Sequence, residues 1–399
     1  MELGAELDLD FPRCLAADFP DDLPGACAAF ESIAGSITAA DFSPLARRSP
    51  ALQGFDWRSY LRCSIARMVH AAAALRRRGV TSGRMLDYGS YFGNFALMFA
   101  RAGFSVDAAD QYRAYEHAFD GPLRLLGGAG VRLLDFDDVG YDLAALGPQY
   151  DVVLCMGVIE HIPSSPRPLL DTLNRVLADG GLLVIDTPNL VHLYNRQKFA
   201  RGESVLPDIQ ARYETGLPFE GHHHEYTIPE LVWLLHRIGH HRISIEAFNY
   251  SSYALGTLSS RDVYNHWNMV RDPTMREYLM TVSVKPAAGM AAEPAAPDWQ
   301  SLIEDPEQSW VRALPAAMHE QPAGVSVGHE LQLVKLQKNY DDVQREVNVR
   351  DEMIRDLHQR LVREVQLRDD IIDGLRRDQD WMRSGWRRFV IRPRAQQKQ

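Results

Sequence analysis

Short apolar runs alternate with amphipathic stretches through the middle of the chain. Around residues 59–78 apolar side chains recur with the spacing of a helix, whereas residues 151–156 are almost all apolar. Such a continuous apolar run is typical of a strand that is covered on both faces of a parallel sheet. The pattern predicts strands at 85–87, 105–109, 131–134, 151–156, 182–185, 243–248 and 279–284. Helical segments such as 169–177 and 229–238 fall between them, which predicts an α/β fold with a doubly wound, mostly parallel seven-stranded sheet.

The chain divides into five segments by pattern and composition. We expect a helical N-terminal cap over 1–80, the α/β domain over 81–285 and a Pro- and Ala-rich linker over 286–328, where Trp299 and Trp310 are candidates to dock on the core. Residues 329–382 carry apolar side chains at most positions of a heptad seam, which predicts a coiled coil that joins two or three chains. Residues 383–399 form a basic, aromatic tail.

The charge is distributed unevenly. The whole chain has a net charge of −10, which argues against binding to nucleic acid, because phosphate neutralisation needs a basic surface. Residues 383–399 nevertheless hold six basic and no acidic side chains, with Trp386 and Phe389 among them. Arginines next to aromatic rings suit an anionic membrane surface, so we expect peripheral attachment through this tail.

Other features of the sequence indicate where in the cell the protein is expected. No apolar run reaches the roughly 18 residues of a membrane span, and the N-terminal residues are acidic rather than basic. We therefore expect a cytoplasmic protein, at most peripheral to the inner face of the membrane. No C-x-x-C pair occurs, so neither a disulfide framework nor a thiolate zinc site is expected. The four cysteines are Cys14, Cys27, Cys63 and Cys155.

A glycine-containing turn follows the first predicted strand. The sequence from Asp87 to Gly93 places Gly89 and Gly93 between that strand and a helix, where backbone N–H groups can face an anionic ligand group. Asp110 follows seventeen residues after Gly93, at the end of the second strand, where an acid can accept both hydroxyl hydrogens of a ribose. This arrangement fits either a dinucleotide or S-adenosyl-L-methionine (SAM).

Three further segments carry a resemblance to one family. Residues 150–163 resemble the fourth-strand motif of class I SAM-dependent methyltransferases, and 177–189 resemble the Gly-Gly turn into their fifth strand. Residues 222–231 resemble the segment that opens the helix before the sixth strand. The resemblance covers about 80–285 and implies a Rossmann-like fold, SAM as the cofactor and methyl transfer as the activity.

The resemblance also implies roles for individual residues. Asp87 and Gly89 would hold the methionine end of SAM, and Asp110 the ribose. Asp135 would take the adenine amine, with Phe136 against the ring. The stretch from Gly157 to Glu160 would form the floor beneath the sulfonium. The complete set of cofactor positions is Asp87, Gly89, Ser90, Tyr91, Gly93, Asp110, Gln111, Asp135, Phe136, Gly157 and Glu160.

Tyr91 departs from the family pattern. It occupies the middle glycine position of the D-x-G-x-G-x-G sequence. If the backbone there needs a positive φ, a tyrosine is strained by about 1–3 kcal/mol. This departure keeps open an alternative in which the fold no longer catalyses and serves as a coiled-coil scaffold.

Candidates for proton transfer follow the fourth and fifth strands. A hydroxyl acceptor benefits from a general base, and His161 and Asp186 both stand where the pocket is expected. His222 is a candidate lid contact to the acceptor or the cofactor. We expect no metal site, because consecutive side chains in the run His222 to His224 point to opposite faces and no carboxylate pair completes a site. Tyr194 and Arg196 either contact a phosphate or a sugar, or belong to a surface helix.

The sequence of the C-terminal tail also suggests a class of methyl acceptor. It resembles the basic, Trp-containing ends that follow coiled coils in bacterial cell-surface polysaccharide enzymes, including O-antigen methyltransferases. The resulting hypothesis is O-methylation of a sugar hydroxyl on a lipid-linked or cell-surface polysaccharide. A small metabolite or a glycan phosphate is the alternative acceptor.

Overall fold

The computed structural model describes most of the chain as two compact units, 1–321 and 322–399, which we treat separately. The described residues are 11–37, 57–147, 149–214, 221–249, 265, 268–269, 272–289, 296–305, 347, 350 and 352–377. The predicted tail, Trp310 and the first part of the predicted coiled coil lie outside these residues, as does most of the predicted linker.

Eight strands of the described residues form one sheet in the order β3-β2-β1-β4-β5-β7-β6-β8. The strands β1 to β5 run parallel, and β7 is inserted antiparallel between β5 and β6. The predicted doubly wound, mostly parallel α/β fold is therefore confirmed. The strands are β1 (Arg84–Tyr88), β2 (Ser105–Asp110), β3 (Arg132–Asp135), β4 (Tyr150–Met156), β5 (Leu177–Pro188), β6 (His241–Phe248), β7 (Tyr278–Val284) and β8 (Ile303–Glu304).

The eighth strand was not predicted. β8 pairs with β6 and comes from the segment that was predicted to be a linker. Trp299 begins a short 3₁₀ turn, η7 (Trp299–Leu302), and packs with Ile303 against the core. A docked aromatic side chain thus brings two residues of the segment to the edge of the sheet.

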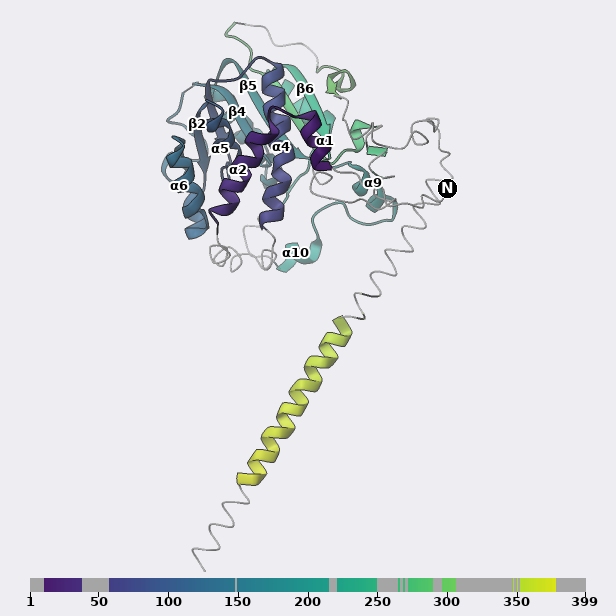
Figure 1. Ribbon diagram of the computed structural model, residues 1–399. Helices are drawn as coiled ribbons and strands as arrows, with labels where there is room; N and C mark the ends of the chain where they lie inside the picture. The colour runs from purple at the N-terminus through teal and green to yellow at the C-terminus, as the bar shows by residue number, and fades with distance from the viewer. Residues whose placement is uncertain are drawn as a thin grey trace, which may run out of the picture. The chain divides into compact units, whose positions relative to one another are not determined.

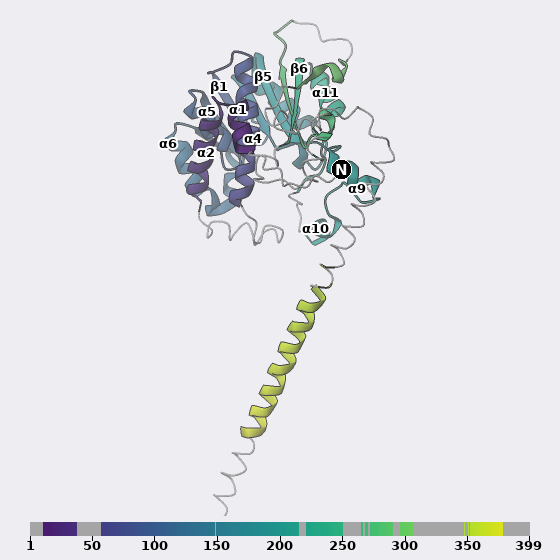
Figure 2. The ribbon, with the colours of Figure 1, turned by 45° about the vertical axis from the view of Figure 1, so that its right-hand side comes forward.

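Helices cover both faces of the sheet (Figure 1). Neighbouring residues of a strand face opposite cores: Met85 and Val152 pack on one side, and Leu86 and Val153 on the other. This double burial explains the continuous apolar run of β4. Figure 2 shows α2, α4 and α5 on one side and α11 on the other. The helices are α1 (Phe11–Asp18), α2 (Leu23–Gly35), α4 (Trp57–Arg77), α5 (Asn94–Arg101), α6 (Asp120–Gly128), α7 (Phe136–Val139), α8 (Arg167–Val176), α9 (Leu193–Ala200), α10 (Ile209–Glu214) and α11 (Ile228–Arg237).

The helix α4 is bound to the far edge of the sheet by charged groups. His70 and Arg77 both contact the carboxylate of Glu246 on β6, and Arg78 pairs with Glu304 on β8 at 3.0 Å. Glu246 is buried, which alone would raise its pKa, but His70 and Arg77 outweigh burial and hold the pKa below its ordinary value. The N-terminal helices are thus part of the same folded unit as the sheet.

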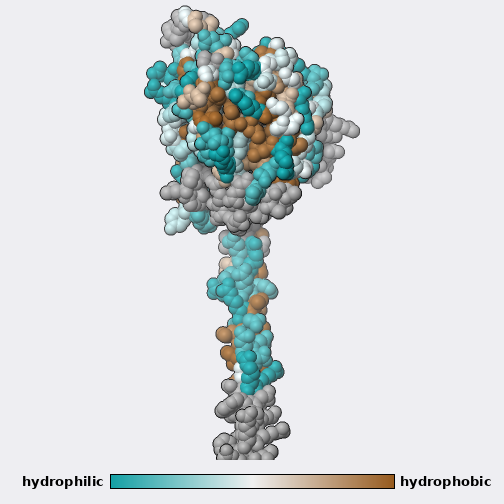
Figure 3. All heavy atoms as spheres, turned by 90° about the vertical axis from the view of Figure 1, so that its left-hand side faces the viewer, coloured by the Kyte–Doolittle hydropathy of each residue, from teal (hydrophilic) through white to brown (hydrophobic). Residues whose placement is uncertain are grey.

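The second unit contains a helix over 352–377. The predicted heptad is confirmed as helical over these residues. Its large apolar side chains are exposed, and Figure 3 shows them at the helix surface between hydrophilic ones. The seam positions, between 54% and 64% exposed, are Ile354, Leu357, Leu361, Ile371 and Leu375. In the part of the chain that the structure describes, no helix is long and apolar enough to cross a membrane.

Candidate functional site

The turn between β1 and α5 requires glycine at two positions. Gly89 has a φ of 74° and Gly93 a φ of 79°, both in the left-handed region. A Cβ at Gly89 would lie 2.4 Å from Val158, and one at Gly93 would lie 2.5 Å from Leu126. The close packing of this turn therefore leaves no room for a side chain at either position.

Tyr91 lies in the same turn with a φ of 50°, so the position does adopt the left-handed conformation that the family meets with glycine. Its ring contacts Trp57 at 6.1 Å, Phe92 at 4.3 Å and Phe119 at 5.5 Å between centroids. Its backbone N–H donates to Asp110 Oδ2 at 2.6 Å. Aromatic packing and this hydrogen bond offset the cost of the strained backbone.

Two buried carboxylates flank the turn. Asp87 Oδ2 accepts the N–H of Ala96 at 3.1 Å, one of the otherwise unpaired donors in the first turn of α5. Asp110 accepts the N–H groups of Tyr91 and Gln111, both at 2.6 Å. Burial raises the pKa of Asp87 to about 7 and that of Asp110 to about 6. Each carboxylate oxygen keeps a second lone pair for a ligand hydroxyl or ammonium.

Asp135 and Phe136 lie beside Asp110. The register of β2 and β3 pairs Asp110 with Asp135 at the carboxyl edge of the sheet. Asp135 caps α7 and accepts the N–H of Asp137 at 2.9 Å and of Arg113 at 3.1 Å. The ring of Phe136 stacks on Tyr141, with centroids 4.9 Å apart.

Asp186, a predicted candidate base, is paired with an arginine. Arg67 of α4 donates to both carboxylate oxygens, Nε to Oδ2 at 2.8 Å and Nη2 to Oδ1 at 2.7 Å, and both residues are buried. Burial raises the pKa of Asp186 although Arg67 lowers it, and both carboxylate oxygens are committed to the guanidinium. Gly157 has a φ of 65°, and a Cβ there would lie 2.8 Å from Arg67 Nη2. Asp186 therefore positions Arg67 over the floor of the site.

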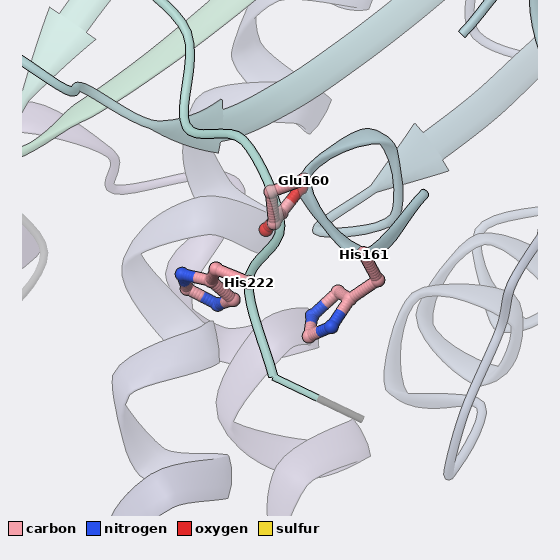
Figure 4. Close-up of side chains that lie close together, drawn as sticks. All are labelled: Glu160, His161 and His222. Atoms are coloured by element: carbon pink, nitrogen blue, oxygen red, sulfur yellow. The ribbon is translucent and has the colours of Figure 1, made fainter. Parts of the chain in front are cut away.

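The turn after β4 and a loop that is distant in sequence bring together three side chains of the types that can bind a metal ion. Glu160 and His161 belong to the 3₁₀ turn η4 (Ile159–His161), and His222 comes from the loop before α11 (Figure 4). Backbone N–H groups of His223 and His224 donate to the carbonyl oxygen of Glu160 at 2.7 and 3.2 Å. These bonds hold the loop against the turn.

The side chains of this cluster differ in environment. Glu160 is 1% exposed, and its Oε2 has no hydrogen-bond partner among the described residues. Burial raises the pKa of Glu160 to about 7. The ring of His222 meets that of His161 edge to face, with centroids 4.8 Å apart. His222 Nδ1 donates to Glu225 Oε1 at 2.8 Å, a bond that together with Glu160 outweighs burial and raises the pKa of His222.

The side chain of Arg196 forms hydrogen bonds with nearby groups of the protein. It belongs to α9, and its guanidinium donates to the Val191 carbonyl at 2.6 Å and to the Thr274 carbonyl and hydroxyl at 3.0 and 2.9 Å. Tyr194 lies on the same short helix. Arg196 thus fixes a surface helix, one of the two alternatives that the sequence left open.

Sequence reasoning did not identify four residues of this region. Arg67 is flanked by apolar residues in α4, and a charge inside an apolar stretch was the only signal for it. Tyr112 shares a hydrogen bond of 2.7 Å with Ser90. Asn94 is buried directly after Gly93, and its Oδ1 has no partner within the described ranges. Tyr141 is the stacking partner of Phe136, and nothing in the sequence marks it.

Residues 57–244 match a family model described as "Methyltransferase domain". The chain contains a methyltransferase domain over these residues. The cradle at Gly89 and Gly93, the acid at the end of β2 and the aromatic pair after β3 fit SAM as the cofactor of this methyltransferase. A search of curated proteins found no match.

Several solved structures of methyltransferases match part of this chain at low identity. The phosphoethanolamine N-methyltransferase 2 of Haemonchus contortus is 17% identical, with a TM-score of 0.35, over 54% of this chain and 52% of that enzyme. The match thus spans about half the length of the Haemonchus contortus enzyme. The 1,6-didemethyltoxoflavin N1-methyltransferase of Burkholderia thailandensis is 18% identical, with a TM-score of 0.35, over 55% and 78% of the two chains. A SAM-dependent methyltransferase of Archaeoglobus fulgidus is also 18% identical, with a TM-score of 0.36, over 55% and 94%.

The buried acids predict an unusual pH dependence of stability. Because the pKa of Asp87 rises from 3.8 to about 7 on folding, the folded protein binds more protons than the unfolded one between these values. The free energy of unfolding therefore decreases as the pH rises through this window. In Asp87→Asn the amide oxygen can still accept the Ala96 N–H, and no charge is buried.

We expect Asp87→Asn to be more stable than the wild type at pH 8 by on the order of 1–3 kcal/mol, with the difference shrinking towards pH 5. Urea unfolding at both pH values, without ligand, measures this. Asp171→Asn, an exposed substitution on α8, is the control. Equal stability of Asp87→Asn and the wild type at pH 8 would contradict the assignment.

Proposed function

We propose that the protein is a SAM-dependent O-methyltransferase that acts on a sugar hydroxyl of a lipid-linked or cell-surface polysaccharide. The observation that carries this proposal is the cluster of Glu160, His161 and His222 directly after the floor of the cofactor site. A hydroxyl acceptor must lose a proton, and this cluster supplies the groups that can take it.

The remaining residues position the reactants. Bound SAM supplies an electrophilic methyl group on its sulfonium sulfur. Gly89 and Gly93 allow the backbone to approach the ligand, and Asp110 accepts the ribose hydroxyls. Alignment of acceptor and donor can account for much of the acceleration of such a displacement.

His161 is the base in this proposal. Its side chain is exposed at the edge of the site, while Glu160 beside it is buried. His161 would take the proton of the acceptor hydroxyl, and SAM would supply the methyl group that the oxygen receives. His222, oriented by Glu225, lies beside His161 and would contact the acceptor.

Exposed apolar side chains would suit a lipid-linked acceptor. The segment after β5 exposes four large apolar side chains, each 63% to 88% accessible. Where such groups form a contiguous patch, they are a feature of surfaces that bind partners or lipids. They are Phe199, Leu206, Ile209 and Tyr213. The predicted tail 383–399 would add contacts with anionic headgroups at the inner face of the membrane.

Methyl transfer can be measured with SAM labelled on its methyl group and a lipid-linked glycan extract in anionic vesicles. We expect label in the glycan, and a rate at least about 100-fold lower for His161→Ala because the base is lost. Removal of 383–399 should lower transfer to vesicle-bound acceptor but not to the released glycan.

The control is His224→Ala, an exposed histidine of the same loop. Label found only in small metabolites or on glycan phosphates would overturn the proposed acceptor. Near-normal turnover of His161→Ala would exclude it as the base. Unchanged transfer after removal of the tail would argue against membrane attachment.

We also propose that the heptad segment joins two or three copies of this chain. The exposed seam of the helix 352–377 has apolar residues at five of its seven heptad positions, with Glu364 and Arg368 at the other two, a pattern typical of a coiled coil. A single helix leaves this seam in water, whereas a second copy buries it.

Substitution of two seam residues tests this self-association. Leu357→Asp with Leu361→Asp should reduce the mass measured by light scattering to that of one chain, because charges at the seam repel. Gln359→Asp, on the opposite side of the same helix turn, should leave the oligomer intact. A wild-type protein that is monomeric at micromolar concentration would refute the proposal.

A further inference from the structure

We propose that Glu160, His161 and His222 bind a divalent transition-metal ion, with Zn²⁺ as the best match to their donors. The candidate ligand atoms of these residues lie within 4.8 Å of one another. One carboxylate and two imidazoles form a set that suits Zn²⁺ and leaves a position open for a ligand oxygen. We expected no metal from the sequence, because the run of histidines has alternating directions and no carboxylate pair was evident near it; the sequence did not reveal that Glu160 and His161 lie beside His222.

The strongest indication is the buried carboxylate. Glu160 is 1% exposed, and its Oε2 has no hydrogen-bond partner in the described part of the chain. A carboxylate in this position is costly to bury unless it is paired or coordinates a metal. A cation between Glu160 and the two rings supplies the missing partner.

The orientation of His222 is the second indication. Its Nδ1–H donates to Glu225 Oε1 at 2.8 Å, which directs the other ring nitrogen, Nε2, away from Glu225. Metal-binding histidines almost always make such a bond, since it fixes the tautomer and the direction of the ring. Glu225 would thus be the positioning partner of a His222 ligand.

The geometry needs only a small adjustment. Two ligand atoms bound to one tetrahedral zinc are about 3.4 Å apart, given bond lengths of about 2.1 Å. The backbone bonds from His223 and His224 to Glu160 already hold the loop in place. The exposed side chain of His161 can rotate to close the remaining distance.

The ion also has a chemical role, and this part rests on the proposed function. An acceptor hydroxyl that coordinates the ion has a lower pKa, because a metal stabilises the oxyanion as a Lewis acid. His161 is the base in the metal-free protein, as proposed above, whereas with the ion bound it would be a ligand and the hydroxyl proton would pass to water. The ion would also hold the acceptor oxygen above the floor formed by Gly157.

Binding can be tested on the full chain after treatment with a chelator. Titration with Zn²⁺ by calorimetry, and with Co²⁺ by visible absorption, should show one ion per chain and the absorption of a four-coordinate site. His161→Ala and Glu160→Gln should abolish that absorption. Glu225→Gln should weaken binding by about 10- to 100-fold.

The control is His224→Ala, because a run of histidines binds metals without a built site. If His224→Ala weakens binding as much as His222→Ala, or if Glu160→Gln binds normally, the proposal is wrong. His161 is exposed, so His161→Ala tests the site without disturbing the core. Binding of S-adenosylhomocysteine to the metal-free protein, measured in parallel, separates failure of the metal site from failure of the proposed methyltransferase activity.

Discussion

The buried ion pair between Arg67 and Asp186 connects the N-terminal helices to the carboxyl edge of the sheet. Arg67 reaches from α4 to the end of β5, and its guanidinium also lies over the rings of Phe95 and Tyr278 at 5.5 and 5.0 Å. Removal of either charge would leave the other buried and unpaired, which typically costs about 3–5 kcal/mol. Because the guanidinium occupies the space beside Gly157, the floor of the site depends on the same pair.

The other buried carboxylates of the site supply negative charge that can bind a cationic ligand. Burial raises the pKa of Asp87, Asp110 and Glu160 at one edge of the sheet. Without a ligand these carboxylates cost stability near neutral pH, whereas the sulfonium and ammonium of SAM, or a metal ion at Glu160, would offset that cost. Perturbed acids of this kind are typical of functional sites.

Much of the fold could be predicted from the sequence, because strands buried on both faces, such as β4, have a clear apolar pattern. The glycines of the first turn and Asp110 were also recognisable, since only a few residue types satisfy those backbone and hydrogen-bonding demands. The partner of Asp186 was not, because Arg67 is 119 residues away and local pattern carries no information about it. The proximity of Glu160 and His222 could not be predicted either, because it depends on a loop that folds back over the turn.

Binding of SAM through Asp110 and the glycine turn is the property on which the site depends. Calorimetric titration of the full chain with S-adenosylhomocysteine measures it most directly, with Asp110→Ala as the site variant and Asp171→Ala as an exposed control. We expect micromolar binding that Asp110→Ala abolishes and Asp171→Ala preserves. A folded wild-type protein that binds no S-adenosylhomocysteine would contradict it and would favour the non-catalytic scaffold.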